Sequence, residues 1–372
     1  MRRRPIPVLA WVVRGFAAIA VAVALLFLPS PWTLPANPGA PVLVRATILK
    51  EPVAGGADAP ATVEVRLLEG SQSGDVVQVA IDLGGEVRGE IPYAVGDEVL
   101  VAEAQDGDGG VSRAVVDRSR GSALLLIVAL FAALVVAVAG ATGARALFAL
   151  FASGVLLVRF GIPALLSGAP PLLVAGCIAV TVGTATVLIT EGFSRRSTAI
   201  VIGIAGSLVV VALVSSLLDR VLAFTPYGGD ADLIYLIPLF GSQVDLRGIG
   251  LAAVLIGTLG IVDDVAATQA AAVEELRQAS PRASAAALWR STIAIGRSHI
   301  GAVINTLPLA YLASAMPLVV TVLTSPGGLT AHIGTEVIAV EVVRSLIGTA
   351  GVLLAMPLTT LAALLVGVGE RD

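Results

Sequence analysis

The residues of this chain best placed to do chemistry are polar groups inside or beside two apolar runs within residues 250–316. Asp263 and Asp264 end the first run, whereas Asn305 and Thr306 lie inside the second. Ionisable and amide side chains at membrane depth are costly, so they usually face protein or a water-filled cavity and often serve function. The pattern therefore predicts a site for an ion or small solute on these two segments.

The aspartate pair has two interpretations. Adjacent side chains on a helix point about 100° apart, so Asp263 and Asp264 are not expected to face the same partner. In the first interpretation, one carboxylate faces the helix bundle and holds a cation or a proton. In the second, the pair simply marks the point at which the helix leaves the membrane.

The second apolar run contains a proline that is expected to break its helix. Pro308 has no N–H, so the carbonyl of Ile304 loses its helical partner beside the Asn305 amide and the Thr306 hydroxyl. Interrupted helices whose carbonyls line a cavity are a recurrent ion-binding device. The alternative is a kink at which Asn305 hydrogen-bonds to a neighbouring helix. If the two spans pack together, Asp263 and Asn305 are expected at similar depth.

The composition is that of an integral membrane protein. The 372 residues are 56% hydrophobic and 13% charged, with a mean hydropathy of +0.94, whereas soluble domains carry about 25% charged residues. The net charge of -4 and the lack of a basic stripe argue against nucleic-acid binding. No P-loop, zinc-protease pattern or nucleophile elbow occurs. The lipid bilayer is the expected partner; no enzymatic activity and no cofactor are expected, and metal binding is left open.

Two elements precede the transmembrane region. Residues 1–35 are predicted to form a cytoplasmic N-terminus and a first transmembrane helix over Gly15–Leu28, retained as a signal anchor because no clear cleavage site closely follows it. Residues 36–120 are predicted to form an extracytoplasmic all-β domain, either a sandwich or a small barrel of OB-like type. Its expected strands are Val42–Leu49, Thr62–Leu68, Val76–Ile81, Glu98–Glu103 and Val111–Val116.

The rest of the chain, residues 121–372, is predicted to form a seven-helix transmembrane domain. The apolar runs lie at about 121–140, 145–166, 169–190, 198–218, 248–266, 299–322 and 345–367. Each is near the roughly 20 residues that cross a bilayer, which makes about eight transmembrane helices with the first. More arginines fall on the proposed inner segments than on the outer flanks, so both termini are expected in the cytoplasm. Residues 267–297 are predicted to be an amphipathic connector along the cytoplasmic face.

Several motifs resemble the YibE/F-like family of bacterial multi-pass membrane proteins. They are Gly260-Ile-Val-Asp263-Asp264-Val, Gln269, Gly296-Arg297-Ser298-His299-Ile300, Asn305-Thr306-Leu307 and Ala310-Tyr311. The resemblance implies a polytopic protein of the bacterial plasma membrane with an extracytoplasmic N-terminal domain. It also adds Gln269, Arg297 and Tyr311 to the candidate binding residues. The family usually carries an aspartate at Ser298, so any role of that aspartate is lost or performed differently here.

Two functions of different class fit these observations. The first is a permease for an ion or small solute, whose inner gate includes Asp263, Asp264, Asn305 and Thr306. The second is a non-catalytic scaffold or envelope assembly factor, in which the β domain and the connector join an envelope protein to a cytoplasmic partner. An intramembrane enzyme that uses the aspartate pair is a third reading. A homo-oligomer is compatible with all of them.

Overall fold

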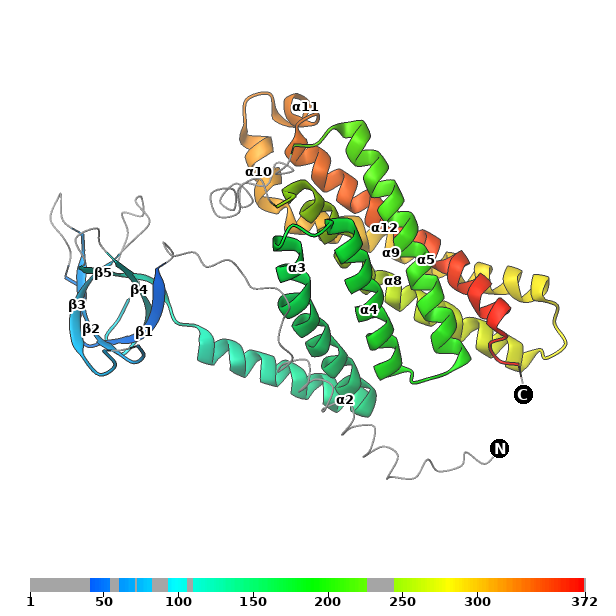
Figure 1. The fold of residues 1–372 in the computed structure, drawn as a ribbon, viewed down its shortest axis with the longest axis horizontal. Helices are drawn as coiled ribbons and strands as arrows, with labels where there is room; N and C mark the ends of the chain where they lie inside the picture. Colours follow the sequence, from blue (N-terminus) through cyan, green and yellow to red (C-terminus); the bar gives the residue numbers. More distant parts are fainter. Residues whose placement is uncertain are drawn as a thin grey trace. The chain divides into compact units, whose positions relative to one another are not determined.

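The computed structural model describes residues 41–53, 60–70, 72–81, 93–105, 110–225 and 244–370, apart from the side chains of residues 105, 246, 247, 299 and 302. These residues divide into two compact units, with the division between Val138 and Ala139 (Figure 1). The predicted first transmembrane helix lies outside the described residues.

The first unit contains a closed five-stranded barrel (Figure 1). Its strands are β1 (Val42–Ile48), β2 (Thr62–Leu67), β3 (Val76–Ile81), β4 (Glu98–Gln105) and β5 (Val111–Arg118). Around the barrel their order is β1-β2-β3-β5-β4. All neighbours are antiparallel except β3 and β5, which pair in parallel at Ala80↔Ala114 and Ile81↔Val115.

The barrel closes around side chains that point inward at every second residue of its strands. In β2, Val63, Val65 and Leu67 are at most 2% exposed, whereas Arg66 between them is exposed. Successive side chains of a strand point to opposite faces, so this alternation gives one apolar face to the barrel interior. The prediction of a β-rich N-terminal domain with five strands is confirmed.

The second unit is helical. Its first helix begins before the division between the two units and ends after it. The helices are α2 (Gly121–Leu156), the π-helical segment η1 (Leu157–Gly161), α3 (Ile162–Leu166), α4 (Pro171–Thr190), α5 (Arg195–Leu222), α8 (Leu246–Ala279), α9 (Ala285–Ser314), α10 (Met316–Thr324), α11 (Gly328–His332) and α12 (Glu336–Val366). Within the described ranges, five helices are long and apolar enough to cross a membrane, or six if the bent pair α9–α10 forms one span. The membrane character is confirmed, but eight transmembrane helices are not.

The two spans predicted at 121–140 and 145–166 form one helical stretch of 46 residues, Gly121–Leu166. At 1.5 Å of rise per residue, such a stretch is about twice as long as the hydrocarbon core is thick. Gly140 interrupts it with φ 57° and ψ -137°, backbone angles that only glycine adopts readily. The interruption therefore falls where the sequence predicts the boundary between the two spans.

The helix break predicted at Pro308 lies elsewhere. Pro308 is inside α9, which continues to Ser314, and the chain then bends by 67° into α10. Pro317 occupies the first turn of α10, where the missing N–H removes no helical hydrogen bond. The correction has a simple reason: an interior proline removes one bond that neighbouring groups can replace, whereas a new helix starts readily at a proline.

The predicted connector at 267–297 is part of the helix bundle. Residues 267–279 extend α8, residues 285–297 begin α9, and a turn with Pro281 separates them. Ser284 caps α9 by accepting a hydrogen bond from the Ala287 N–H at 3.2 Å. Val273 and Leu288 on this stretch are at most 2% exposed. An apolar stripe on both arms therefore packs this hairpin against the neighbouring helices, and its polar side stays exposed.

Close helix approach holds the centre of the bundle together. A Cβ built on Gly203 of α5 would lie 1.9 Å from the Thr359 Oγ1 of α12. One on Gly351 of α12 would lie 2.8 Å from the Thr258 Cγ2 of α8. Small residues at such crossings let helix backbones approach closely in membranes, so α5, α8 and α12 form the tightly packed core.

Candidate functional site

The predicted site residues lie in different environments on α8 and α9. Gln269 is buried, with 4% of its surface exposed. Asp263 and Tyr311 are half-buried. Asp264, Arg297, Asn305 and Thr306 are exposed. The structure therefore gathers these residues into no single pocket.

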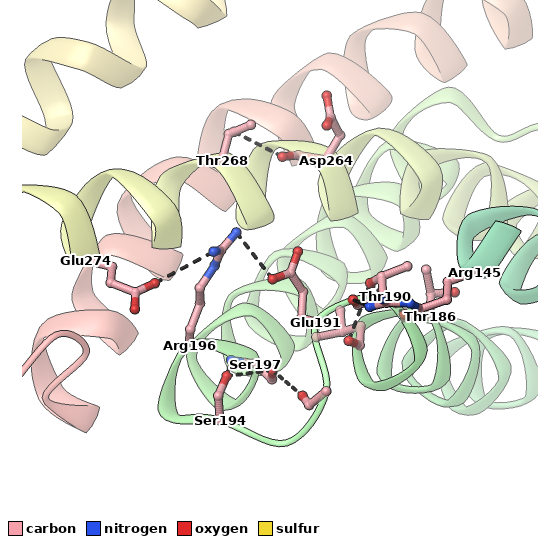
Figure 2. A network of polar contacts seen from close by, with 12 residues as sticks. Arg145, Thr186, Thr190, Glu191, Ser194, Arg196, Ser197, Asp264, Thr268 and Glu274 are labelled. Atoms are coloured by element: carbon pink, nitrogen blue, oxygen red, sulfur yellow. Dashed lines mark hydrogen bonds and ion pairs between the residues drawn. The ribbon is translucent and has the colours of Figure 1, made fainter. Parts of the chain in front are cut away.

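Asp264 points out of the bundle. Figure 2 shows its carboxylate directed away from Arg196, on the other side of α8. The Thr268 Oγ1 donates to the Asp264 backbone carbonyl at 3.0 Å, not to the carboxylate. The neighbouring Asp263 is half-buried. The two adjacent carboxylates thus differ in exposure, as expected for consecutive residues on a helix.

Asp263 and Asn305 lie at different levels of the α8–α9 hairpin. The hydrogen bond from Gln269 to Thr292 places these two residues opposite each other. Asp263 lies six residues before Gln269 on α8, and Ser298 lies six residues after Thr292 on α9. Asn305 is a further seven residues along, which is about 10 Å at the helical rise. The two predicted halves of the site are therefore not brought to a similar depth.

Gln269 joins three helices inside the bundle. Its Nε2 donates to the Thr292 backbone carbonyl of α9 at 2.9 Å and to the Thr360 Oγ1 of α12 at 3.0 Å. The Thr360 hydroxyl in turn donates to the Met356 carbonyl at 2.8 Å. Both amide protons and the single hydroxyl proton are used, so the side chains are fixed in one arrangement.

Gly296 makes this junction sterically possible. A Cβ at this position would lie 2.4 Å from the Met356 sulfur and 2.8 Å from the Gln269 Oε1. Real Cβ atoms do not approach so closely, so any side chain at this position would force the Met356 and Gln269 side chains to move. The glycine of the Gly296-Arg297 motif therefore has a packing role, whereas Arg297 faces outward.

Buried polar groups continue through the interior between α5, α8, α9 and α12. We call them the polar seam: Ser207, Ser215, Thr258, Gln269, Thr292, Thr359 and Thr360, all at most 4% exposed. Some are satisfied by a neighbouring helix, since the Ser207 Oγ of α5 donates to the Gly351 carbonyl of α12 at 2.6 Å. The hydroxyls of Ser215, Thr292 and Thr359 have no hydrogen-bond partner among the described residues. The seam therefore contains polar atoms that the bundle itself leaves unsatisfied.

Of the seam, the sequence predicted only Gln269. A detectable signal was present on α5, where Gly203, Ser207 and Ser215 recur at spacings of four and eight residues, one face of a helix. The serines and threonines of the seam were not singled out because an isolated serine or threonine in an apolar run is usually satisfied by its own helix. Thr258 is one such residue, with its Oγ1 donating to the Val254 carbonyl at 2.7 Å.

A charged network joins one end of these helices (Figure 2). Arg196, at the start of α5, lies between Glu191, just after α4, and Glu274, near the end of α8. Its guanidinium nitrogens are 3.4 Å and 3.6 Å from the two carboxylates. Arg277 of α8 pairs with Glu370 at 3.2 Å. These ion pairs tie together chain segments that share no backbone hydrogen bonds.

Metal coordination has no support in the described part of the chain. No group of three or more His, Cys, Asp or Glu side chains there converges so that it could hold a metal ion. The single cysteine, Cys177, is exposed on α4. The chemistry that the described interior offers is therefore that of neutral oxygens and amide groups.

Comparison with known proteins identifies the family. No curated protein and no solved structure matches the chain. A family model described as YibE/F-like protein matches residues 127–367, which include the whole of α4, α5, α8, α9 and α12. These residues contain the polar seam and the ion pairs of Arg196 with Glu191 and Glu274. The chain therefore belongs to the YibE/F-like protein family.

Proposed function

We propose that this YibE/F-like protein is a permease that moves an ion or small solute along the polar seam. The observation that carries the proposal is the set of buried, unpartnered hydroxyls on Ser215, Thr292 and Thr359. A buried polar group without a partner costs about 1–3 kcal/mol. Such groups persist where a passing solute, ion or water satisfies them, as in the interior sites of transporters.

The chemistry of the seam favours a particular class of substrate. Its side chains are hydroxyls and one amide, all uncharged at neutral pH. Neutral oxygens suit a partly dehydrated monovalent cation or a small polar solute better than a divalent cation, which requires carboxylates. Asp263, half-buried on α8, would serve at the entrance to this path and not in its centre.

The proposal includes a membrane topology. Eight transmembrane helices, with both termini in the cytoplasm of a bacterium, place the barrel outside the plasma membrane and the Arg196 network at the inner face. The barrel would be of OB-like type and would bind a partner or restrict access to the seam. The protein needs no enzymatic step and no cofactor for this function.

Charge movement in proteoliposomes on a solid-supported membrane tests the proposal. A panel of monovalent cations, divalent cations, anions and pH jumps is applied to wild type, Thr292→Val and Thr359→Val. Valine keeps the shape of threonine and removes the hydroxyl, so both variants should lose most of a monovalent-cation current. Thr268→Val, which alters an exposed hydroxyl of α8, should keep it. Folded protein that is silent across the panel, or variants that conduct like wild type, would contradict the proposal.

The barrel favours scaffolding as a second candidate function. Val42, Leu43 and Val111 are exposed by 66%, 54% and 52%. Val42 pairs with Glu103 and Val111 with Gln105 of β4, so these apolar side chains lie at one end of the barrel. In a scaffold, deletion of residues 36–115 abolishes function in vivo while any transport by the helical unit continues. If the deletion abolishes transport together with function in vivo, the permease is favoured.

A further inference from the structure

The outward face of α9 carries an amide that has no hydrogen-bond partner among the described residues. Asn305 is exposed, and no side-chain hydrogen bond of the described residues involves it. By contrast, Ser298 on the same face satisfies itself, since its Oγ donates to the Ile295 carbonyl at 2.7 Å. The inward face of α9 is apolar and packed, with Ile300 and Leu307 each 6% exposed.

Asn305 lies at the middle of the membrane-spanning helices. A Cβ built on Gly348 of α12 would lie 3.6 Å from Leu307 and 3.3 Å from the Tyr311 hydroxyl. Gly348 is near the centre of α12, Glu336–Val366. Asn305 is two residues from Leu307, about 3 Å along the axis. Lipid tails offer no hydrogen bonds, so an exposed amide at this depth costs several kcal/mol unless another polypeptide covers it.

The surroundings of Asn305 permit a close helix–helix contact. Ala294, Ser298 and Gly301 lie on the same outward face and are all exposed. A Cβ built on Gly301 would meet nothing within 4 Å, so this glycine is not required by packing inside the protomer. Small residues around a polar side chain are the usual composition of a transmembrane helix interface.

We propose that this face of α9 is the contact between two copies of the chain, with Asn305 paired to Asn305 across a two-fold axis. An amide is both a donor and an acceptor, so two copies related by a two-fold axis satisfy each other with a reciprocal pair of hydrogen bonds. A single buried asparagine fixes register and partner in helical dimers in this way. The second copy is favoured as the occupant because it offers the complementary group at the same depth.

Disulfide crosslinking in native membranes tests the contact. In a Cys177→Ser background, Gly301→Cys places one thiol on the interface and leaves Asn305 intact. Oxidation should give a covalent dimer in Gly301→Cys and none in Leu213→Cys, a control on the exposed side of α5 (65% exposed). Adding Asn305→Leu should weaken dimerisation roughly tenfold, since two interhelical hydrogen bonds are lost, whereas Asn305→Gln should largely retain it.

Single-molecule photobleaching of the intact chain in dilute liposomes gives an independent count. Two bleaching steps are expected for wild type and one for Asn305→Leu, with both proteins monodisperse in detergent. Single steps for wild type would overturn the proposal. So would a Gly301→Cys crosslink to a different protein, or a dimer that Asn305→Leu leaves unchanged.

Discussion

At the scale of single residues, the polar seam is defined by which buried side chains donate and accept hydrogen bonds and which do not. Gln269 is the one seam residue that the sequence singled out, through the motif it shares with the family. Its partners could not be predicted, because Thr292 and Thr360 come from helices whose mutual rotation depends on packing across the bundle. Asp263 and Asp264 stay predictions as site residues, and the structure shows that they face different surroundings.

Replacement of Gln269 is expected to weaken the bundle. In Gln269→Leu the Thr292 carbonyl and the Thr360 hydroxyl lose their side-chain donor, which should cost about 1–3 kcal/mol of unfolding free energy. Gln269→Glu should cost more, because a carboxylate would face acceptor oxygens. Thermal unfolding in detergent measures both, with Gln278→Leu as the matched control on the exposed side of α8. Equal melting temperatures for Gln269→Leu and Gln278→Leu would contradict the junction.

Gly296 is expected to be sensitive to replacement by alanine. Gly296→Ala drives a methyl group into the Met356 sulfur and the Gln269 Oε1, and overpacking of this kind costs about 1–3 kcal/mol. Gly301→Ala, five residues away on the open face, should be nearly neutral in thermal unfolding. Met356→Ala should partly rescue Gly296→Ala. The steric account fails if both alanine variants melt together.

At the scale of elements, the sequence predicted which helices and strands are present better than where the helices begin and end. The five strands were placed within two residues at each end, because alternating apolar residues and Gly, Asp and Pro clusters mark both the strands and their limits. The helices α8 and α9 were predicted too short. Their polar halves carry Gln269 and Thr292, which look like surface residues in sequence but are buried by neighbouring helices. Hydropathy alone cannot distinguish a buried polar face from an exposed one.

The ion pairs of Arg196 are expected to hold α4, α5 and α8 together at one end. Its side chain reaches Glu191 and Glu274 at once, whereas lysine offers a single ammonium group. Arg196→Lys should therefore lose one of the two contacts. Each pair is about one-third exposed, so a double-mutant cycle with Glu274→Ala should give about 1 kcal/mol or less. A coupling energy of zero at low salt would show that the pair contributes nothing.

At the scale of the whole molecule, the chain combines two units with separate cores. The barrel core consists of residues between Ala46 and Val115, and the main helical core of residues between Ala179 and Ala355. The composition predicted this organisation, because the texture of the sequence changes from short alternating runs to long apolar ones. Neither the number of membrane crossings nor the path of the bent pair α9–α10 follows from hydropathy, since both depend on local breaks at Gly140 and Ala315.

The barrel should fold without the helices and respond to acid in a defined way. A fragment of residues 36–120 is expected to unfold cooperatively by circular dichroism. In it, the Arg45 guanidinium that hydrogen-bonds to Glu69 should hold the pKa of that carboxyl below its usual value. A carboxyl whose pKa is lowered by folding stabilises the folded state at pH values above its unfolded-state pKa. This stabilisation is lost as the pH falls through the folded-state pKa. Arg45→Ala should return the pKa of Glu69 to normal in an NMR titration. A fragment without a cooperative transition would contradict independent folding.

Closure of the barrel determines how it can meet another protein. Each of its strands pairs on both sides, and only the contact between β3 and β5 is short, with two paired residues on each strand. A partner therefore has almost no free strand edge on which to add a strand of its own, and must recognise side chains on the rim or the outer wall. The same closure protects these domains from pairing edge to edge when many copies are crowded together.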